Sequence, residues 1–313
     1  MYYAVKHETS FRYSQPISES VMEVYMQPRS EGIQRCLRFK LTTYPRARVF
    51  EHSDLLGNAV HSFDIPVQHE QLTINAESVV ELVAPPPLPD ALGADAWHVL
   101  DRATSSGEYW DMLMPSPSTT TTLPLQDFVQ ELDIRRHTDP LTMLRDITTA
   151  LYENIDYTPN STEVDSPIDV VLETRKGVCQ DFAHVMIALG RSLGIPCRYV
   201  SGYLFYHKDD RSTPDATHAW VEAYLPQTGW IGFDPTNNIL AGERHIRVAV
   251  GRDYSDVPPT RGIFKGKAES ELTVEVNVTQ TESPFTVETL VPVTGWQPEN
   301  DETRPQQQQQ QQQ

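Results

Sequence analysis

The sequence of 313 residues has few of the features that mark secreted, disulfide-bonded or membrane-spanning proteins. Its 3 cysteines, Cys36, Cys179 and Cys197, are few and odd in number, which argues against a disulfide framework. No stretch approaches the roughly 18 apolar residues of a membrane span. The N-terminal segment has no apolar run that could form the core of a signal peptide. We therefore expect a reducing cytoplasm, in which a free thiol survives.

Basic residues are also scarce, with 25 Lys and Arg against 43 Asp and Glu and a formal net charge of -18. Such a surface repels phosphate backbones and anionic lipid, so we expect neither nucleic acid nor membrane as a partner. The oligomeric state does not follow from composition. The sequence contains no CxxC pattern, and the histidines near the N-terminus lack tight ligand spacing. We therefore expect no metal and no other cofactor.

With 39% hydrophobic and 22% charged residues, the chain is typical of a globular protein of one or two domains. Early segments such as YYAVKHETSFRY alternate as strands do, and the prolines of APPPLPD end that pattern. Helical patterns then follow as far as the stretch that ends near Pro196, and extended segments come after it, an order typical of an α+β fold. The predicted parts are a β-domain (1–84), a connector with short helices (85–138), a core with C-terminal strands (139–296) and a disordered glutamine-rich tail (297–313).

One stretch, TRKGVCQDFAHVMIALGRSLGIP, begins like a loop and continues like a buried helix. Its apolar stripe follows the helical period through Phe182, Val185, Met186, Leu189 and Leu193, and Gly194 suits the end of the helix. Cys179 then lies at or near the first helical residue, where unpaired amides and the helix dipole favour a thiolate. By position alone, a buried and inert cysteine remains the more common outcome.

A hairpin farther along the chain supplies a candidate base. In THAWVEAYLP, His218 lies on the polar face, and WIGFDPT runs back and ends at Asp234. Opposed residues of antiparallel strands share a face, so His218 and Asp234 meet only if Tyr224 pairs with Trp230 or the connection has a bulge. Asp234 could then hold the imidazole while the other ring nitrogen takes the thiol proton.

These three segments, GVCQDFAHVMIALGRSLGIPCRYVSGY, HAWVEAYL and GWIGFDPTNN, resemble the transglutaminase-like core of the papain-type superfamily. The segments HETSFRYSQPI, MQPRS and DLLGN resemble the N-terminal β-domain of bacterial transglutaminase-like proteins. The resemblance implies that Cys179 is a nucleophile, His218 its base and Asp234 the orienter of that base. It also implies a papain-like fold, with a nucleophile helix packed on an antiparallel sheet. Cys197 departs from the family pattern, and we expect it to pack as a small hydrophobic residue.

The resemblance implies a cysteine-dependent acyl-transfer enzyme that acts on peptide or side-chain amides through a thioester. We favour a peptidase or amidase, because water is always available as the acceptor. The alternatives are a protein-glutamine transglutaminase, a binding or scaffold protein on an inactive fold, and a redox thiol protein. Trp220 and Tyr203 are candidates for binding the peptide or protein substrate. His184 is five residues past Cys179, and we expect it to be packed and hydrogen-bonded.

Overall fold

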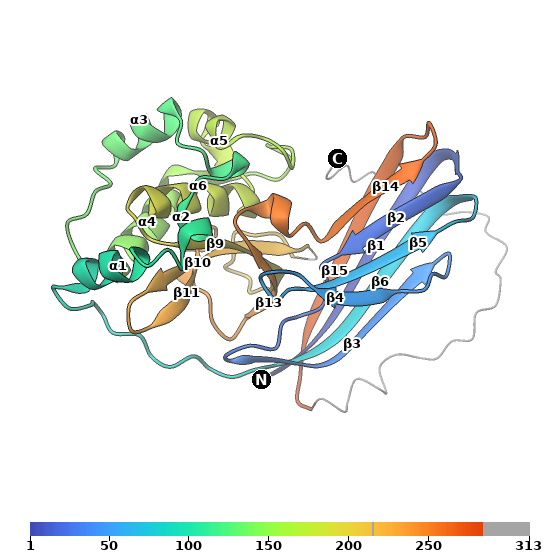
Figure 1. Ribbon diagram of the computed structural model, residues 1–313, viewed down its shortest axis with the longest axis horizontal. Helices are drawn as coiled ribbons and strands as arrows, with labels where there is room; N and C mark the ends of the chain where they lie inside the picture. The colour runs from blue at the N-terminus through green and yellow to red at the C-terminus, as the bar shows by residue number, and fades with distance from the viewer. Residues whose placement is uncertain (215, 284–313) are drawn as a thin grey trace.

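The computed structural model describes residues 1–214 and 216–283, and the predicted glutamine-rich tail from residue 297 lies outside them. The described residues form two lobes that lie side by side (Figure 1). One lobe consists of two β-sheets, and the other consists of helices packed around a third sheet. This mixture of helices and strands, with a β-rich N-terminal region, confirms the predicted fold class.

The strand lobe is a sandwich of two four-stranded sheets. One sheet has the order β15 (Ser270–Thr281), β1 (Tyr2–Ile17), β6 (His69–Leu82) and β3 (Gln34–Tyr44). The other has the order β14 (Thr260–Lys265), β2 (Glu19–Val24), β5 (Ala59–Ile65) and β4 (Phe50–Ser53). Buried and exposed side chains alternate along β2, as they do in a strand with one face on a core. Both sheets supply that core, which includes Ile17, Met22, Phe63 and Ile74.

The C-terminal strands belong to this sandwich. β15 pairs antiparallel with β1, from Tyr2↔Thr281 to Tyr13↔Ser270, and β14 pairs antiparallel with β2. The sequence predicts these strands within the core that starts at residue 139, and the observed pairing differs from that prediction. Alternation reveals which face of a strand is buried, but it does not reveal which distant strand lies beside it.

The chain enters the helical lobe after the proline-rich stretch from residue 84 to 90. Short helices follow, namely α1 (Ala96–Thr104), α2 (Trp110–Leu113), η1 (Pro117–Thr119) and α3 (Leu123–Glu131). α4 (Pro140–Asn154) begins with a side-chain cap, because Asp139 Oδ1 accepts hydrogen bonds from the amides of Leu141 at 3.0 Å and Thr142 at 3.2 Å. Within the described ranges, no helix is long and apolar enough to cross a membrane.

The central helix of this lobe, α6 (Cys179–Ser192), follows α5 (Ile168–Thr174) and is buried over almost its whole length. It packs on a sheet with the order β12 (Ile239–Leu240), β11 (Gly229–Asp234), β10 (His218–Leu225), β9 (Cys197–Leu204) and β13 (His245–Gly251). The small apolar side chains of β10 share one core with α6. Gly194, with φ +77°, takes the left-handed conformation expected just past the helix. Two short parallel strands, β7 (Asp156–Tyr157) and β8 (Lys176–Gly177), lie before α6.

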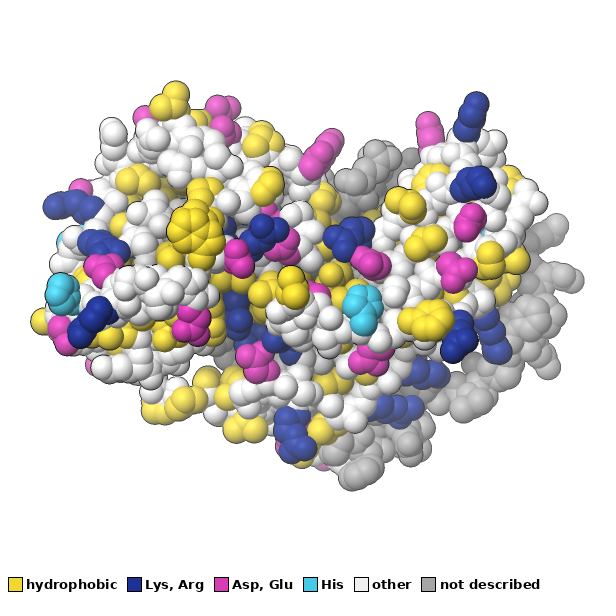
Figure 2. Space-filling model, viewed as in Figure 1, with side chains coloured by type: hydrophobic (Ala, Val, Ile, Leu, Met, Phe, Trp, Pro, Cys, Tyr) yellow, Lys and Arg dark blue, Asp and Glu magenta, His cyan; other side chains and the backbone are white. Residues whose placement is uncertain are grey.

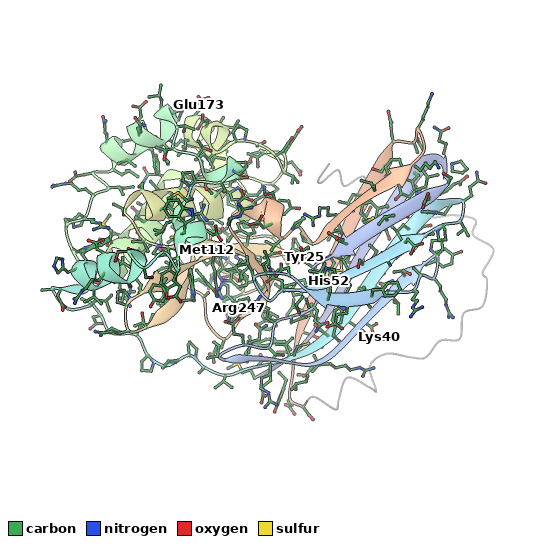
Figure 3. The ribbon with its side chains drawn as sticks, viewed as in Figure 1. Tyr25, Lys40, His52, Met112, Glu173 and Arg247 are labelled. Carbon is green, nitrogen blue, oxygen red and sulfur yellow. The ribbon has the colours of Figure 1, made fainter. Side chains whose placement is uncertain are left out.

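Side-chain amides of the strand lobe fix its position against β13. Asn58 donates from Nδ2 to Val250 O at 2.8 Å and accepts from Val250 N at 2.9 Å. Gln34 makes the same pair of bonds with Arg247, at 2.7 Å and 2.8 Å. Each amide takes the place of a neighbouring strand along β13, and Figure 3 shows Arg247 at this junction of the lobes. The two lobes are therefore held by directional bonds as well as by apolar contact.

Candidate active site

Cys179 is the first residue of α6 and is half-buried. The turn before it requires a glycine, because a Cβ on Gly177 would lie 2.9 Å from Asp181 Cβ and 3.2 Å from Val171 Cγ1. The buried Asp181 carboxylate accepts hydrogen bonds from Val178 N at 2.7 Å and Thr162 Oγ1 at 2.6 Å. This capping holds the glycine turn against the first turn of α6, where Cys179 lies. Burial raises the pKa of Asp181 above its usual value.

The hairpin of β10 and β11 has the register that brings His218 and Asp234 to one face. Tyr224 pairs with Trp230, and Leu225 pairs with Gly229. The condition that the sequence analysis set is therefore met. Between the strands lie three residues, with Gln227 at φ 72°, followed by Gly229 at φ 78°. The odd connection keeps both side chains on the same face of the sheet.

The Asp234 carboxylate is completely buried and saturated with hydrogen bonds. His218 Nε2 lies 2.7 Å from Oδ2, and Asn237 Nδ2 donates to the same oxygen at 2.8 Å. The amides of Thr236 and Asn237 donate to Oδ1 at 3.0 Å and 3.2 Å. Burial disfavours the charge, but the interactions with His218 and His245 outweigh burial and hold the pKa of Asp234 well below its usual value.

His218 lies between Asp234 and Cys179. Its Nε2 is engaged by Asp234, which leaves Nδ1 as the ring nitrogen available to the thiol. Burial disfavours the imidazolium, but the Asp234 carboxylate and a hydrogen bond and charge from Cys179 outweigh burial and raise the pKa of His218. The three residues named from the sequence therefore lie together, in an arrangement suited to a thiolate and imidazolium pair.

A further histidine, His245 on β13, reaches the same carboxylate. Its Nε2 lies 3.1 Å from Asp234 Oδ2, and the Gly242 amide donates to its Nδ1 at 3.3 Å. Because Nδ1 accepts a hydrogen bond, Nε2 carries the proton and donates it to Asp234. Burial lowers the pKa of His245, so the ring is neutral near pH 7. His245 was not among the residues predicted from the sequence, because no local pattern shows that β13 lies beside β9.

His218, Asp234 and His245 also form a set of potential metal ligands, since their nearest ligand atoms lie within 4.8 Å of one another. The hydrogen bonds argue against this use. The Nε2 atoms of both histidines face Asp234 Oδ2, and a nitrogen that donates its proton there has no lone pair for a metal.

Trp220 and Tyr203 were predicted to bind the substrate, but both side chains lie outside the Cys179 cleft. Trp220, 1% exposed, stacks on His218 with ring centroids 6.1 Å apart and meets His245 edge-on at 5.1 Å. Tyr203, 2% exposed, lies at the junction of the lobes, with its hydroxyl 3.0 Å from His7 Nδ1. Neither lines the cleft of Cys179. Both prefer burial because their rings pack on histidines, which alternation along a strand does not reveal.

The cleft at Cys179 has a volume of about 100 Å³ and is lined instead by other aromatic and hydroxyl side chains, which include Tyr157, Tyr199, Ser201 and Thr217. Burial, with the charge of Cys179, raises the pKa of Tyr157 and keeps Tyr199 protonated far above neutral pH. Tyr199 was not predicted at the cleft, although it lies on the same face of β9 as Tyr203, four residues away. The walls of the cleft around Cys179 and His218 therefore carry neutral hydroxyl groups.

The remaining candidate groups have structural surroundings. His184 accepts a hydrogen bond from Tyr254 N at 3.1 Å, and burial lowers its pKa to about 4. This matches the expectation of a packed and hydrogen-bonded histidine. Cys197 is fully buried against Gly190, and burial raises its pKa to about 12. Burial likewise raises the pKa of Cys36 to about 11.

Comparison with known proteins matches a family model to part of each lobe. Residues 126–235 match the model of the transglutaminase-like superfamily, and residues 3–81 match that of the bacterial transglutaminase-like N-terminal region. An uncharacterized protein of Mycobacterium leprae is 33% identical over 281 residues, which cover 88% of this chain and 98% of the relative.

Two further matches cover different shares of this chain. A protein-glutamine gamma-glutamyltransferase of Pseudomonas aeruginosa is 35% identical over 92 residues, which are 26% of this chain and 13% of that enzyme. A solved structure from Cytophaga hutchinsonii, described as a candidate cysteine protease, has a TM-score of 0.68 at 23% identity. The match covers 90% of this chain and 92% of the Cytophaga hutchinsonii chain, so the two proteins share the fold of both lobes.

Proposed function

The chain belongs to the transglutaminase-like superfamily, and from this premise we propose that it is a cysteine-dependent acyl-transfer enzyme. The reaction we favour is hydrolysis of a peptide or side-chain amide through a thioester on Cys179. The observation that carries this proposal is the buried hydrogen bond of 2.7 Å between His218 and Asp234, on a histidine that also interacts with the thiol at a helix start.

The first half of the reaction forms the thioester. The Cys179 thiolate attacks the amide carbonyl carbon, and the carbonyl π electrons move onto oxygen. Backbone amides at the start of α6 stabilise this oxyanion, because they precede the intrahelical bonds that begin with Asp181 N donating to Val178 O. His218 donates its Nδ1 proton to the amide nitrogen, the C–N bond breaks, and an amine leaves.

The second half consumes water. Neutral His218 takes a proton from a water molecule, whose oxygen attacks the thioester carbonyl. The C–S bond breaks, a carboxylic acid leaves, and the thiolate and imidazolium are restored. Asp234 keeps the imidazole ring in place throughout. His245 acts on Asp234 by donating a hydrogen bond from the side of β13, and it does not touch the reacting atoms.

All three cysteines are free thiols, which supports a reducing compartment. We propose a peptide or protein as substrate, a reducing cytoplasm as the compartment, and neither nucleic acid nor membrane as a partner. The acidic composition supports the last two exclusions.

A peptide library tests this function. We expect the wild-type chain to cleave a subset of quenched fluorescent peptides and Cys179→Ala to cleave none. Cys197→Ala is the matched control, because it removes a thiol that the cleft does not contain. Equal activity of wild type and Cys179→Ala would reject the proposal. Lack of activity in the wild type and in both variants would favour a binding protein on the same fold.

A transglutaminase is the second candidate, favoured by the local identity with the Pseudomonas aeruginosa enzyme. In that reaction a primary amine replaces water as the acceptor, and the same residues act. Incubation with a glutaminyl peptide and a labelled amine distinguishes the hydrolase from the transglutaminase. Incorporation of the labelled amine into the peptide would identify the transglutaminase reaction and reject hydrolysis.

A further inference from the structure

The small cleft at Cys179 continues into a much larger groove between the lobes. The groove has a volume of about 690 Å³, against about 100 Å³ at Cys179. Thr217, Tyr254 and Pro259 line both, so the two spaces share one wall. In Figure 1, β14 borders this space on one side and the loop before α5 lies across from it, and Figure 2 shows a notch between the lobes there. A substrate longer than one amide can therefore leave the cleft along this groove.

The strand lobe supplies an apolar wall of the groove. Its contributions come from β1, β2, β14 and β15 and include Phe11, Met22, Ile263, Leu272 and Val274. Ile263 is 75% exposed, although a side chain of this type prefers burial. Across the groove lie the prolines and valine of the helical lobe, Pro117, Val164 and Pro167. Such walls fit apolar side chains and offer little to a small polar amide.

β14 is an edge strand and begins beside the cleft. Among residues 1–214 and 216–283 it pairs with β2 alone and ends the order of its sheet. In an antiparallel pair, every second residue directs its N–H and C=O away from the partner strand. These groups of β14 can accept another strand, as exposed sheet edges do. Pro259 lines the Cys179 cleft and directly precedes Thr260, so a chain paired with β14 leads to the thiol.

The width of the groove is set by the lobe junction. The paired amide bonds of Asn58 with Val250 and of Gln34 with Arg247 fix the strand lobe against β13. The hydroxyl of Tyr203 adds a bond to His7, a residue that itself lines the groove. The site is therefore preformed, and binding an extended segment does not require the lobes to move.

We propose that the substrate is an extended polypeptide segment with apolar side chains, which adds to the edge of β14 and lies along this groove to reach Cys179. The strand lobe thus acts as the part that selects the substrate. This inference rests on the proposed function, since it assumes that Cys179 is where the segment is attacked. It excludes small free amides as good substrates.

Binding to the full-length Cys179→Ala variant tests the groove without chemistry. The probe is a fluorescent decapeptide of alternating valine and lysine, measured by anisotropy. Adding Ile263→Asp weakens binding by about fivefold or more, because a charge replaces an apolar contact. Val67→Asp is the matched control, since Val67 is an apolar residue of the strand lobe, 55% exposed, that does not line the groove. We expect it to change binding less than twofold.

N-methylated versions of the decapeptide test the strand pairing itself. Methylation removes one N–H donor at a time, and about half of these donors would face β14. We expect losses of about fivefold or more at alternate positions and little loss at the positions between them. A loss without this two-residue period, or equal binding by the Ile263→Asp and Val67→Asp variants, would overturn the proposal.

Other occupants of the groove give different results. Self-association of the chain that Ile263→Asp abolishes would assign the groove to a second copy. A chain ending at Ser283 that gains affinity for the decapeptide would assign it to the chain's own C-terminal segment. Either result overturns the inference. Peptide binding without turnover by wild type would refute the proposed function alone, and turnover of small amides without peptide binding would refute the groove alone.

Discussion

His245 Nε2 lies 3.1 Å from Asp234 Oδ2, so the carboxylate that holds His218 is itself held by a second histidine. The Gly242 amide fixes the tautomer of His245, and burial lowers the pKa of this ring. A neutral donor on one side and a charged ring on the other give Asp234 an asymmetric pair of partners. This relationship predicts that His245 positions Asp234 and influences the titration of His218 through it.

Removing that donor lowers turnover. We expect His245→Ala to reduce kcat by about tenfold, the cost of one hydrogen bond to a charged group, with little change in KM. His245→Gln restores part of the rate, because its side-chain amide can donate to Asp234. The pH dependence of kcat is the deciding readout, since a loss of packing alone would not move it. His184→Gln is the control, because His184 is equally buried but does not contact Asp234.

Protonation of His218 gives a pH prediction. Its folded-state pKa is raised, so the imidazolium stabilises the folded chain fully below the unfolded pKa of about 6.5. That contribution is lost as the pH rises through the folded-state pKa. Nitrogen NMR of the labelled ring is expected to show a charged His218 at pH 7.5 in wild type and a lower pKa in Cys179→Ala. Titration of wild-type His218 at or below pH 6.5 would contradict the account.

The three thiols are expected to differ in reactivity. Burial raises the pKa of Cys36 to about 11 and that of Cys197 to about 12, so neither forms a thiolate near pH 7. Cys179 lies beside a histidine with a raised pKa at a helix start. Peptide mapping after brief treatment with iodoacetamide is expected to show label on Cys179 first. Comparable labelling of all three residues would favour a non-catalytic fold.

Gly177→Ala tests the turn that presents the thiol. The added Cβ would lie 2.9 Å from Asp181 Cβ, and the buried carboxylate has little room to move. We expect a loss of about 1–3 kcal/mol in the free energy of unfolding and a slower reaction of Cys179 with iodoacetamide. Gly93→Ala provides the control, because its Cβ would meet only an exposed Asp95 oxygen at 3.1 Å. Chemical denaturation measures both variants.

Local patterns predicted much of the helical lobe. The stripe after Cys179 gave the extent of α6, because helix periodicity depends on neighbouring residues. The parity of the hairpin was predictable as a condition, since it follows from strand geometry alone. Its outcome required the length of the connection, which is set by Gln227 and Gly229 in left-handed conformations.

The rest depends on contacts between residues far apart in sequence. His245 reaches Asp234 because β13 pairs with β9, and β15 returns across more than 250 residues to pair with β1. Trp220 and Tyr203 were predicted at the substrate surface, but each ring is buried on a histidine from another strand. A single sequence contains no signal for such partners, because alternation specifies a face and not a neighbour.

The most direct test of the account is a search for the acyl-enzyme by intact-protein mass spectrometry. Wild-type chain mixed briefly with an excess of a cleavable peptide, or with an activated ester of its acyl part, and quenched in acid is expected to gain the mass of that acyl group. Fragmentation is expected to place the added mass on Cys179, and hydroxylamine is expected to remove it. Absence of the adduct while turnover proceeds, or turnover by Cys179→Ala, would contradict the central claim that Cys179 carries the acyl group.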